Sequence, residues 1–315
     1  MHFESFRTKD GTVLAAHHAG KGDLPIVLAN GLGGTFTAWH PLVDAFQDRV
    51  RFYSWDYRGL YRSEPPADRE TLEVPAQADD LFDLMDHFGV EKAIVAGWSM
   101  GVQVALEAVR KHPERIIGLI LMNGTYGAPF DTAFGSLPTR RLLPAVLQFG
   151  RAAGPLTQMV VHAVARSRYT VPVATKLHLV DGHMEDGLFY GIAREFSHLD
   201  MDLYIETLIR LAHHDAGDVL ADVEVPVLLI SGDRDIMTPT AVTDRMVREM
   251  PQAELFVVPR GTHYCLIEYP EIVALRVEKF LAEHYGLRPH GPAAGPAKKK
   301  TVARKRAPAK KQAKR

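Results

Sequence analysis

Short apolar runs alternate with helix-like segments along most of this chain, and that alternation limits the folds open to it. We expect strands at residues 25–30, 50–55, 93–97, 116–122, 227–231 and 255–258. Apolar residues at helical spacing predict helices at residues 76–88, 102–112, 241–250 and 272–285. Short apolar strands that alternate with helices are typical of a mostly parallel sheet covered on both faces. The sequence therefore predicts an α/β fold.

Two segments depart from this alternation. Residues 3–8 and 13–19 flank Lys9-Asp10-Gly11, which predicts a β-hairpin. Residues 125–222 contain no clear strand, and their helix-like pieces lie at residues 141–149, 157–165 and 201–213. Because roughly 100 residues are too many for a simple crossover, we expect a helical subdomain over one end of the sheet. The sheet domain would then comprise residues 1–124 and 223–287.

Apolar side chains recur in the expected helical subdomain and have two interpretations. They could contact a substrate or pack in the core of the subdomain, and helical spacing favours the core. The residues concerned are Met159, Met184, Phe189, Tyr190, Phe196 and Met201.

Charge is divided unequally along the chain. The whole sequence holds 37 Lys and Arg against 38 Asp and Glu. Residues 288–315 hold 11 of the basic residues and no acidic one, which leaves 26 basic and 38 acidic residues in the body. This tail has little to bury, so we expect it to be disordered. It would attract nucleic acid or an anionic membrane surface, or extend as a solvated segment that docks on the acidic body.

Other features bear on the compartment. The single cysteine, Cys265, excludes an internal disulfide and with it a disulfide-stapled secreted scaffold. No apolar run approaches the roughly 18–20 residues of a membrane helix, so we expect no transmembrane segment. The first residues, MHFESFRTKDG, lack the pattern of a signal peptide. We therefore expect a cytoplasmic protein, and the sequence leaves its oligomeric state open.

The segment Gly97-Trp98-Ser99-Met100-Gly101 matches G-x-S-x-G and lies between an expected strand and an expected helix. A sharp turn from strand to helix strains the backbone of its central residue, and the flanking glycines keep neighbouring atoms clear. The Ser99 hydroxyl would then stand at the carboxyl end of the sheet, near the N–H groups that open a helix. The alternative interpretation is a chance pentapeptide whose serine caps the helix.

A serine hydroxyl becomes a strong nucleophile only beside a base, and the base needs an orienting acid. Asp233 and Asp235 follow one of the later strands, and His263 follows the last strand. We select Asp235 as the acid because its loop position can reach over the sheet end, whereas Asp233 adjoins the strand and is placed to hold the turn. The alternatives are a loop-capping role for Asp235 and a structural role for His263.

Acyl transfer also needs N–H donors for the oxyanion that forms. The N–H of Met100 directly follows Ser99, and the N–H of Leu32 lies in the glycine-rich turn at residues 30–34. Gly31 and its neighbours in this turn let the backbone approach a substrate closely, and we expect Gly31 and Trp98 to contact the substrate. The turn lacks the spacing of a dinucleotide or P-loop motif. A turn that only connects a strand to a helix is the alternative.

Taken together, these motifs resemble the α/β-hydrolase fold superfamily, in its serine esterase and lactonase branch with a helical cap. The matching segments are NGLGGT (30–35), DYRGLYRS (56–63), GWSMG (97–101), GDRDIMTP (232–239) and GTHYCLIEYP (261–270). The resemblance implies a mostly parallel twisted sheet flanked by helices, with residues 125–222 as a cap over the pocket. It also implies Ser99 as nucleophile, Asp235 as acid, His263 as base, and Leu32 and Met100 as backbone donors.

Two positions depart from the family pattern. Asn30-Gly31 stands where members often have His-Gly, and an asparagine can still brace the turn through hydrogen bonds. Tyr61 replaces a glycine of D-x-R-G-x-G-x-S, which makes that turn bulkier and would narrow the edge of the pocket. Because Ser99 rather than an aspartate occupies the nucleophile position, the dehalogenase and epoxide-hydrolase branches are disfavoured.

The sequence thus predicts a serine hydrolase that cleaves a carboxylic ester or lactone through an acyl-enzyme on Ser99. We expect no metal site and no organic cofactor. C–C bond hydrolysis, amide cleavage, perhydrolysis and acyl transfer use the same three residues and stay open. A non-catalytic binding protein on the same fold is the alternative from a different class, because function depends on the site and not on the fold.

Overall fold

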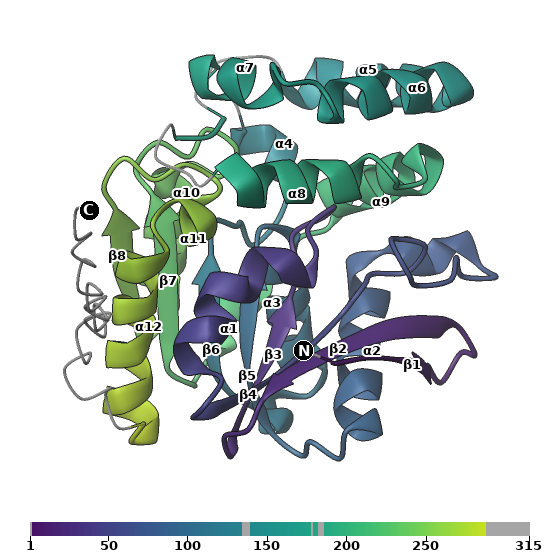
Figure 1. Ribbon diagram of the computed structural model, residues 1–315. Coiled ribbons are helices and arrows are strands. Elements are labelled where there is room, and N and C mark those ends of the chain that lie inside the picture. Colours follow the sequence, from purple (N-terminus) through teal and green to yellow (C-terminus); the bar gives the residue numbers. More distant parts are fainter. Residues whose placement is uncertain (1, 134–138, 178, 182–185, 288–315) are drawn as a thin grey trace, which may run out of the picture.

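An eight-stranded sheet forms the centre of the computed structural model, which describes residues 2–133, 139–177, 179–181 and 186–287 (Figure 1). The expected tail at residues 288–315 lies outside the described residues. The strands stand in the order β1-β2-β4-β3-β5-β6-β7-β8, in which β1 and β2 form an antiparallel hairpin and the strands from β4 to β8 run parallel. Their bounds are His2–Arg7, Val13–Gly20, Leu24–Ala29, Val50–Trp55, Ala93–Trp98, Ile116–Met122, Val227–Gly232 and Ala253–Val258 for β1 to β8. The expected mostly parallel sheet is confirmed.

Helices cover both faces of this sheet. One face packs against α2 (Val74–His87), α3 (Met100–Lys111) and α10 (Thr240–Glu249), and Leu81 and Val104 belong to the core on this side. The opposite face packs against α1 (His40–Phe46), α11 (Cys265–Glu268) and α12 (Pro270–Tyr285), with Phe46 and Phe280 in that core. Every residue of β5 is buried, because helices cover this central strand on both sides. A strand covered on both faces has apolar residues at every position, which explains the continuous apolar sequence of β5.

A further set of helices lies beyond the carboxyl ends of the strands. Figure 1 shows α8 and α9 above the sheet, with α5, α6 and α7 as the layer farthest from it. The bounds are Pro129–Thr132 for α4, Thr139–Ala152 for α5, Gly154–Ala165 for α6, Thr170–Lys176 for α7, Asp186–Phe196 for α8 and Met201–His213 for α9. These helices all fall within residues 125–222, whose role as a separate cap stays a prediction.

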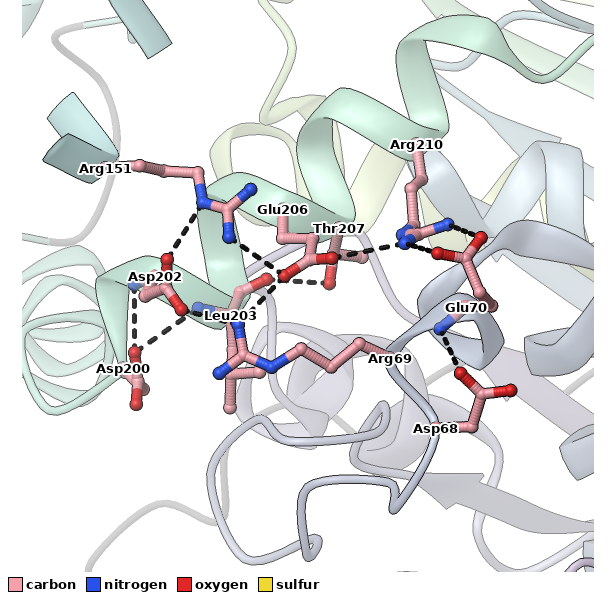
Figure 2. A network of polar contacts seen from close by, with 10 residues as sticks. All are labelled: Asp68, Arg69, Glu70, Arg151, Asp200, Asp202, Leu203, Glu206, Thr207 and Arg210. Carbon is pink, nitrogen blue, oxygen red and sulfur yellow. Dashed lines mark hydrogen bonds and ion pairs between the residues drawn. The ribbon is translucent and has the colours of Figure 1, made fainter. Parts of the chain in front are cut away.

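Ion pairs fasten α9 to the sheet domain and to the outer layer (Figure 2). Arg69, in the short 3-10 helix η2 (Arg69–Leu72), contacts Asp202 at 2.6 Å and Glu206 at 3.0 Å. Arg151 of α5 contacts the same two carboxylates at 2.8 Å and 3.1 Å. Arg210 adds a contact to Glu206 at 3.2 Å. Helix α9 is therefore joined by charge to elements on both sides of it.

Candidate active site

Ser99 occupies the turn between β5 and α3 and has a strained backbone. Its φ of 55° and ψ of −115° are conformations that residues with side chains rarely adopt. A Cβ atom at Gly97 would lie 2.3 Å from the carbonyl oxygen of Gly101, and one at Gly101 would lie 2.0 Å from that of Ala29. Neither position has room for a side chain, which explains the glycine at each end of the turn. The turn leaves the Ser99 side chain on the wall of a cavity at the carboxyl end of β5.

His263 lies in the loop after β8 and joins the other two candidate residues. Its Nε2 is 2.9 Å from Ser99 Oγ, and its Nδ1 is 3.0 Å from Asp235 Oδ2. The backbone carbonyl of His263 accepts a hydrogen bond from Trp98 Nε1 at 3.0 Å, which fixes the loop against the serine turn. The structure thus brings Ser99, His263 and Asp235 together in one hydrogen-bonded chain.

Asp235 follows β7 and accepts hydrogen bonds on both oxygens. Oδ1 accepts from the N–H groups of Met237 at 2.9 Å and Thr238 at 2.8 Å. Oδ2 accepts from Thr238 Oγ1 at 2.6 Å and from Asn123 Nδ2 at 2.9 Å. Burial opposes ionisation of this carboxyl, but the neighbouring His263 and the bonds from Thr238 outweigh it and lower the pKa of Asp235 below its usual value. Asp235 is therefore a fixed, ionised acceptor for His263 Nδ1.

Asn123 is a residue of this site that the sequence analysis missed. It directly follows β6 with a φ of 44°, a left-handed conformation that asparagine tolerates better than most residues. Besides Asp235, its Nδ2 donates to the carbonyl of Thr262 at 3.1 Å. Its Oδ1 accepts from Cys265 Sγ at 2.6 Å, and burial raises the pKa of the Cys265 thiol, which keeps it a donor. Asn123 therefore connects the acid loop to the histidine loop.

The glycine-rich turn after β3 lies directly beside the serine. A Cβ atom at Gly31 would lie 3.2 Å from the Cβ of Ser99 and 3.0 Å from Cε3 of Trp98. Leu32 follows in the same turn and lines the same cavity as Ser99. Met100 is the first residue of α3, and the first N–H groups of a helix have no acceptor within the helix. Both residues adjoin Ser99 as the expected anion site requires, and the role of their amides stays a prediction.

The two departures from the family pattern both act on this turn. Asn30 accepts a hydrogen bond from Trp39 Nε1 at 2.8 Å and donates to the carbonyl of Trp55 at 2.9 Å. Tyr61 has a φ of 52°, and its hydroxyl donates to the carbonyl of Gly33. The Tyr61 ring lines a neighbouring hollow rather than the cavity that contains Ser99. The expected narrowing of the cavity by Tyr61 is therefore wrong, because the side chain braces the turn from outside.

The cavity beside Ser99 measures about 420 Å³ and lies between the sheet domain and the overlying helices. Its lining is mainly apolar, and the described residues that form it include no Lys, Arg, Asp or Glu. From the sheet domain come Gly31, Leu32, Gly33, Gly34, Trp98, Ser99, Met237, His263 and Tyr264; the helices and their connections contribute Val160, Val161, Val164, Ala165, Thr170, Phe189, Ile192, Ala193, Phe196 and Tyr204.

The expected core residues of the helical segment divide into three groups. Phe189 and Phe196 line the cavity, although Phe189 is also largely buried. Met201 is buried and Tyr190 is partly buried, whereas Met184 lies outside the described residues. Met159 is 62% exposed, so its expected place in a core is wrong.

Metal-ligating clusters and membrane-spanning helices are both absent from the described residues. No group of three or more His, Cys, Asp and Glu among them is arranged to hold a metal ion. Of the helices in that part of the chain, none has the length and apolar character needed to cross a bilayer.

Comparisons with known proteins agree with this fold. Residues 25–162 match the family model described as alpha/beta hydrolase fold, and residues 212–291 match one described as TAP-like protein. The structure superposes on the esterase EaEST from Exiguobacterium antarcticum with a TM-score of 0.71 and 18% identity, covering 88% of this chain and 98% of the esterase. The chain has the α/β-hydrolase fold.

Curated relatives align with most of this chain. RutD of Caulobacter sp. (strain K31), whose name assigns it as a carbamate hydrolase, is 29% identical over 280 residues, which cover 87% of this chain and 97% of RutD. The 2-hydroxy-6-oxononadienedioate/2-hydroxy-6-oxononatrienedioate hydrolase of Burkholderia vietnamiensis (strain G4 / LMG 22486) is 29% identical over 299 residues, covering 89% of this chain and 98% of the relative. The chain is a hydrolase of this fold.

Proposed function

We propose that this α/β-hydrolase is a serine hydrolase that cleaves a carboxylic ester or lactone through an acyl-enzyme on Ser99. The observation that carries the proposal is the chain of hydrogen bonds from Ser99 Oγ to His263 Nε2 at 2.9 Å and from His263 Nδ1 to Asp235 Oδ2 at 3.0 Å. This series of hydrogen bonds ends at Ser99, which lies on the wall of an apolar cavity of about 420 Å³. A nucleophile, a base within hydrogen-bond reach and an orienting acid are the groups that acyl transfer requires.

In the first step, Ser99 Oγ attacks the carbonyl carbon of the substrate while His263 Nε2 takes the hydroxyl proton. The carbonyl π electrons move to oxygen, and the N–H groups of Leu32 and Met100 donate to the oxyanion. Asp235 keeps the proton of His263 on Nδ1 and balances the positive charge of the imidazolium. The lowered pKa of Asp235 keeps its carboxylate ionised for this role.

The tetrahedral adduct then collapses and the bond from carbon to the leaving oxygen breaks. The leaving alkoxide takes the proton from His263 Nε2, and the acyl group stays on Ser99. Water repeats the attack with His263 as the base, which releases the carboxylic acid and restores the Ser99 hydroxyl. In a lactone the leaving alcohol remains part of the acyl group, so hydrolysis yields one hydroxy acid.

The cavity favours an apolar group on the substrate. Its described lining has no cationic side chain, and a carboxylate moved into such a site without a partner would pay a large desolvation cost. The Burkholderia relative is named for a dicarboxylate substrate, so this lining favours a neutral ester or lactone over that kind of C–C bond substrate. Gly31 and Trp98 line the cavity beside Ser99 and would contact the acyl group.

A fluorophosphonate probe tests the nucleophile directly. We expect the folded wild-type chain to be labelled on Ser99 and the Ser99→Ala variant to stay unlabelled. Absence of labelling on the folded wild type would contradict the proposal and favour a binding protein on this fold.

A series of p-nitrophenyl esters of increasing acyl length, run beside a lactone, an amide and a C–C bond substrate, tests the reaction class. An apolar cavity of about 420 Å³ predicts a short- to medium-chain optimum among the esters. Faster turnover of the amide or the C–C bond substrate than of every ester and lactone would assign one of those reactions instead.

A further inference from the structure

The outermost helices expose an unusual amount of apolar surface. Of the fourteen large apolar side chains exposed in the described part of the chain, ten lie between residues 142 and 177, in α5, α6, α7, the α6–α7 connection and Leu177 directly after α7. Phe149 is 75% exposed and Met159 62%. Scattered exposed apolar residues are normal, but a concentration of this kind marks an interaction surface.

These residues repeat at helical spacing and are exposed. Leu142, Val146 and Phe149 follow one another along α5, and Leu156, Met159 and Val160 begin the corresponding row on α6. The three helices pack on α8 and α9 beneath them, and Figure 1 shows them as the outer layer. Each of these helices therefore packs on α8 or α9 and still exposes a row of apolar side chains. We call this the outer α5–α7 face.

The same segment is cationic within an acidic body. Residues 132–180 contain six Lys and Arg and no Asp or Glu, whereas residues 1–287 as a whole hold 26 basic and 38 acidic residues. Arg166, Arg168 and Lys176 are exposed at the end of α6, in the connection and on α7. Apolar residues bordered by exposed cations are typical of helices that lie on anionic lipid. A second copy of this chain would bring like charges together, and nucleic acid would leave the apolar rows uncovered.

The outer α5–α7 face also reaches the candidate active site. Val160 and Val164 are each at least half exposed on α6, and both line the cavity that contains Ser99. The apolar surface is therefore continuous with the wall of the cavity. A molecule dissolved in lipid would meet the cavity without first crossing a polar surface.

We propose that the outer α5–α7 face binds an anionic lipid surface, with the mouth of the active-site cavity turned toward the lipid. Phe149, Leu156 and Met159 enter the apolar part of the interface, while Arg166 and Arg168 lie at the level of the phosphate groups. The acidic remainder of the body faces away from the lipid, which favours this orientation over others. The binding needs no reaction, so it stands whether or not the proposed ester hydrolysis holds.

Co-sedimentation of the full chain with lipid vesicles tests the surface. We expect binding to vesicles of mixed phosphatidylcholine and phosphatidylglycerol at physiological salt, and weaker binding to phosphatidylcholine alone. The double variant Phe149→Ser, Met159→Ser keeps every charge of the chain, including the tail, and loses two apolar contacts. Its affinity for the mixed vesicles should fall about tenfold or more.

Matched variants separate the outer α5–α7 face from other causes. Leu275 on α12 is 66% exposed and far from this face in the fold, so Leu275→Ser should bind vesicles like the wild type. The variant Arg168→Gln, Lys176→Gln should lose affinity for the mixed vesicles and keep its weak binding to phosphatidylcholine. Hydrolysis of a soluble short ester should be unchanged in all of these variants, because none of the residues lines the cavity. The melting temperature should also be unchanged, because every substituted side chain is exposed.

Three results would overturn the proposal. The wild-type chain could remain in the supernatant with the mixed vesicles. The Phe149→Ser, Met159→Ser variant could bind as tightly as the wild type, which would assign the binding to the basic tail alone. Light scattering could show a wild-type dimer that the same variant converts to a monomer, which would make a second copy the occupant of the face.

Discussion

Replacement of Asp235 by asparagine tests the geometry of the candidate triad most directly. Oδ1 accepts the N–H groups of Met237 and Thr238, while Oδ2 faces Thr238 Oγ1, Asn123 Nδ2 and His263 Nδ1. An asparagine keeps both backbone bonds only with its carbonyl oxygen in the Oδ1 position. Its NH₂ group then meets three groups that donate toward the same point. His263 Nδ1 can accept a hydrogen bond from this NH₂ group only if it carries no proton, and the imidazole proton then moves to Nε2.

The tautomer change sets the size of the effect. An Nε2–H that faces Ser99 Oγ cannot accept the serine proton, and this type of change in a serine triad costs about 10⁴-fold in rate. That factor corresponds to about 5–6 kcal/mol in the activation free energy. The carboxylate also serves Thr238 and Asn123, whose donors lose an acceptor, so we expect the free energy of unfolding to fall by about 1–3 kcal/mol. The variant should therefore fold and be nearly inactive.

The assay is kcat/KM for a soluble p-nitrophenyl ester, measured across a range of pH for the wild type and two variants. Asp233→Asn is the matched control, because Asp233 is an exposed neighbour in the same loop and should keep wild-type activity. Asp235→Asn activity within tenfold of the wild type would refute the reasoning. Loss of activity in Asp233→Asn instead would show that the acid had been assigned to the wrong aspartate.

Three more substitutions give expected outcomes. Tyr61→Phe removes the hydrogen bond to the Gly33 carbonyl, and kcat should fall about fivefold to tenfold in steady-state assays; an unchanged kcat would mean that the turn is held without it. Arg58→Met leaves Asp80 buried without the partner that contacts it at 2.6 Å and 2.7 Å, so urea unfolding near pH 8 should show a loss of about 3–5 kcal/mol. Burial already raises the pKa of Asp80 to about 6 against the opposing pull of Arg58. The folded variant should therefore hold a proton that the unfolded chain releases, and stability should fall as pH rises through the folded pKa. Equal losses near pH 5 and pH 8 would contradict this. Glu206→Gln weakens the ion-pair network that holds α9, so the free energy of unfolding should fall by about 1–3 kcal/mol. Because Tyr204 of α9 lines the cavity, the KM for a soluble ester should also rise.

The sequence predicts those candidate residues that stand in a distinctive local pattern. A continuous apolar run at residues 93–97 followed by G-x-S-x-G predicts both the strand β5 and the turn that presents Ser99. Asp235 and His263 follow later strands, and parallel strands end at one edge of the sheet. The positions of Ser99, Asp235 and His263 after successive strands therefore predict that they lie close together, without any knowledge of side-chain contacts.

Asn123 and Thr238 could not be found in the same way. Asn123 reaches Asp235 because β6 lies beside β7 in the sheet. The residues of a single strand do not reveal which strand lies next to it. The helix α1, with seven residues, is too short for helical spacing to be distinctive. Met159 fails for a different reason, since spacing shows that residues share one side of a helix and not whether that side faces protein or solvent.

The contacts of Trp98 link the shape of the cavity to the position of the base. The Trp98 ring forms part of the cavity wall, and its Nε1 holds the backbone carbonyl of His263. A substitution that reshapes the wall at Trp98 therefore also releases the histidine loop, and specificity cannot change there without a cost in rate. Val164 and Ile192 line the same cavity from α6 and α8, helices that carry no candidate triad residue. Changes in substrate preference should therefore be tolerated on those helices, because Ser99 is fixed by its backbone and Asp235 by four hydrogen bonds.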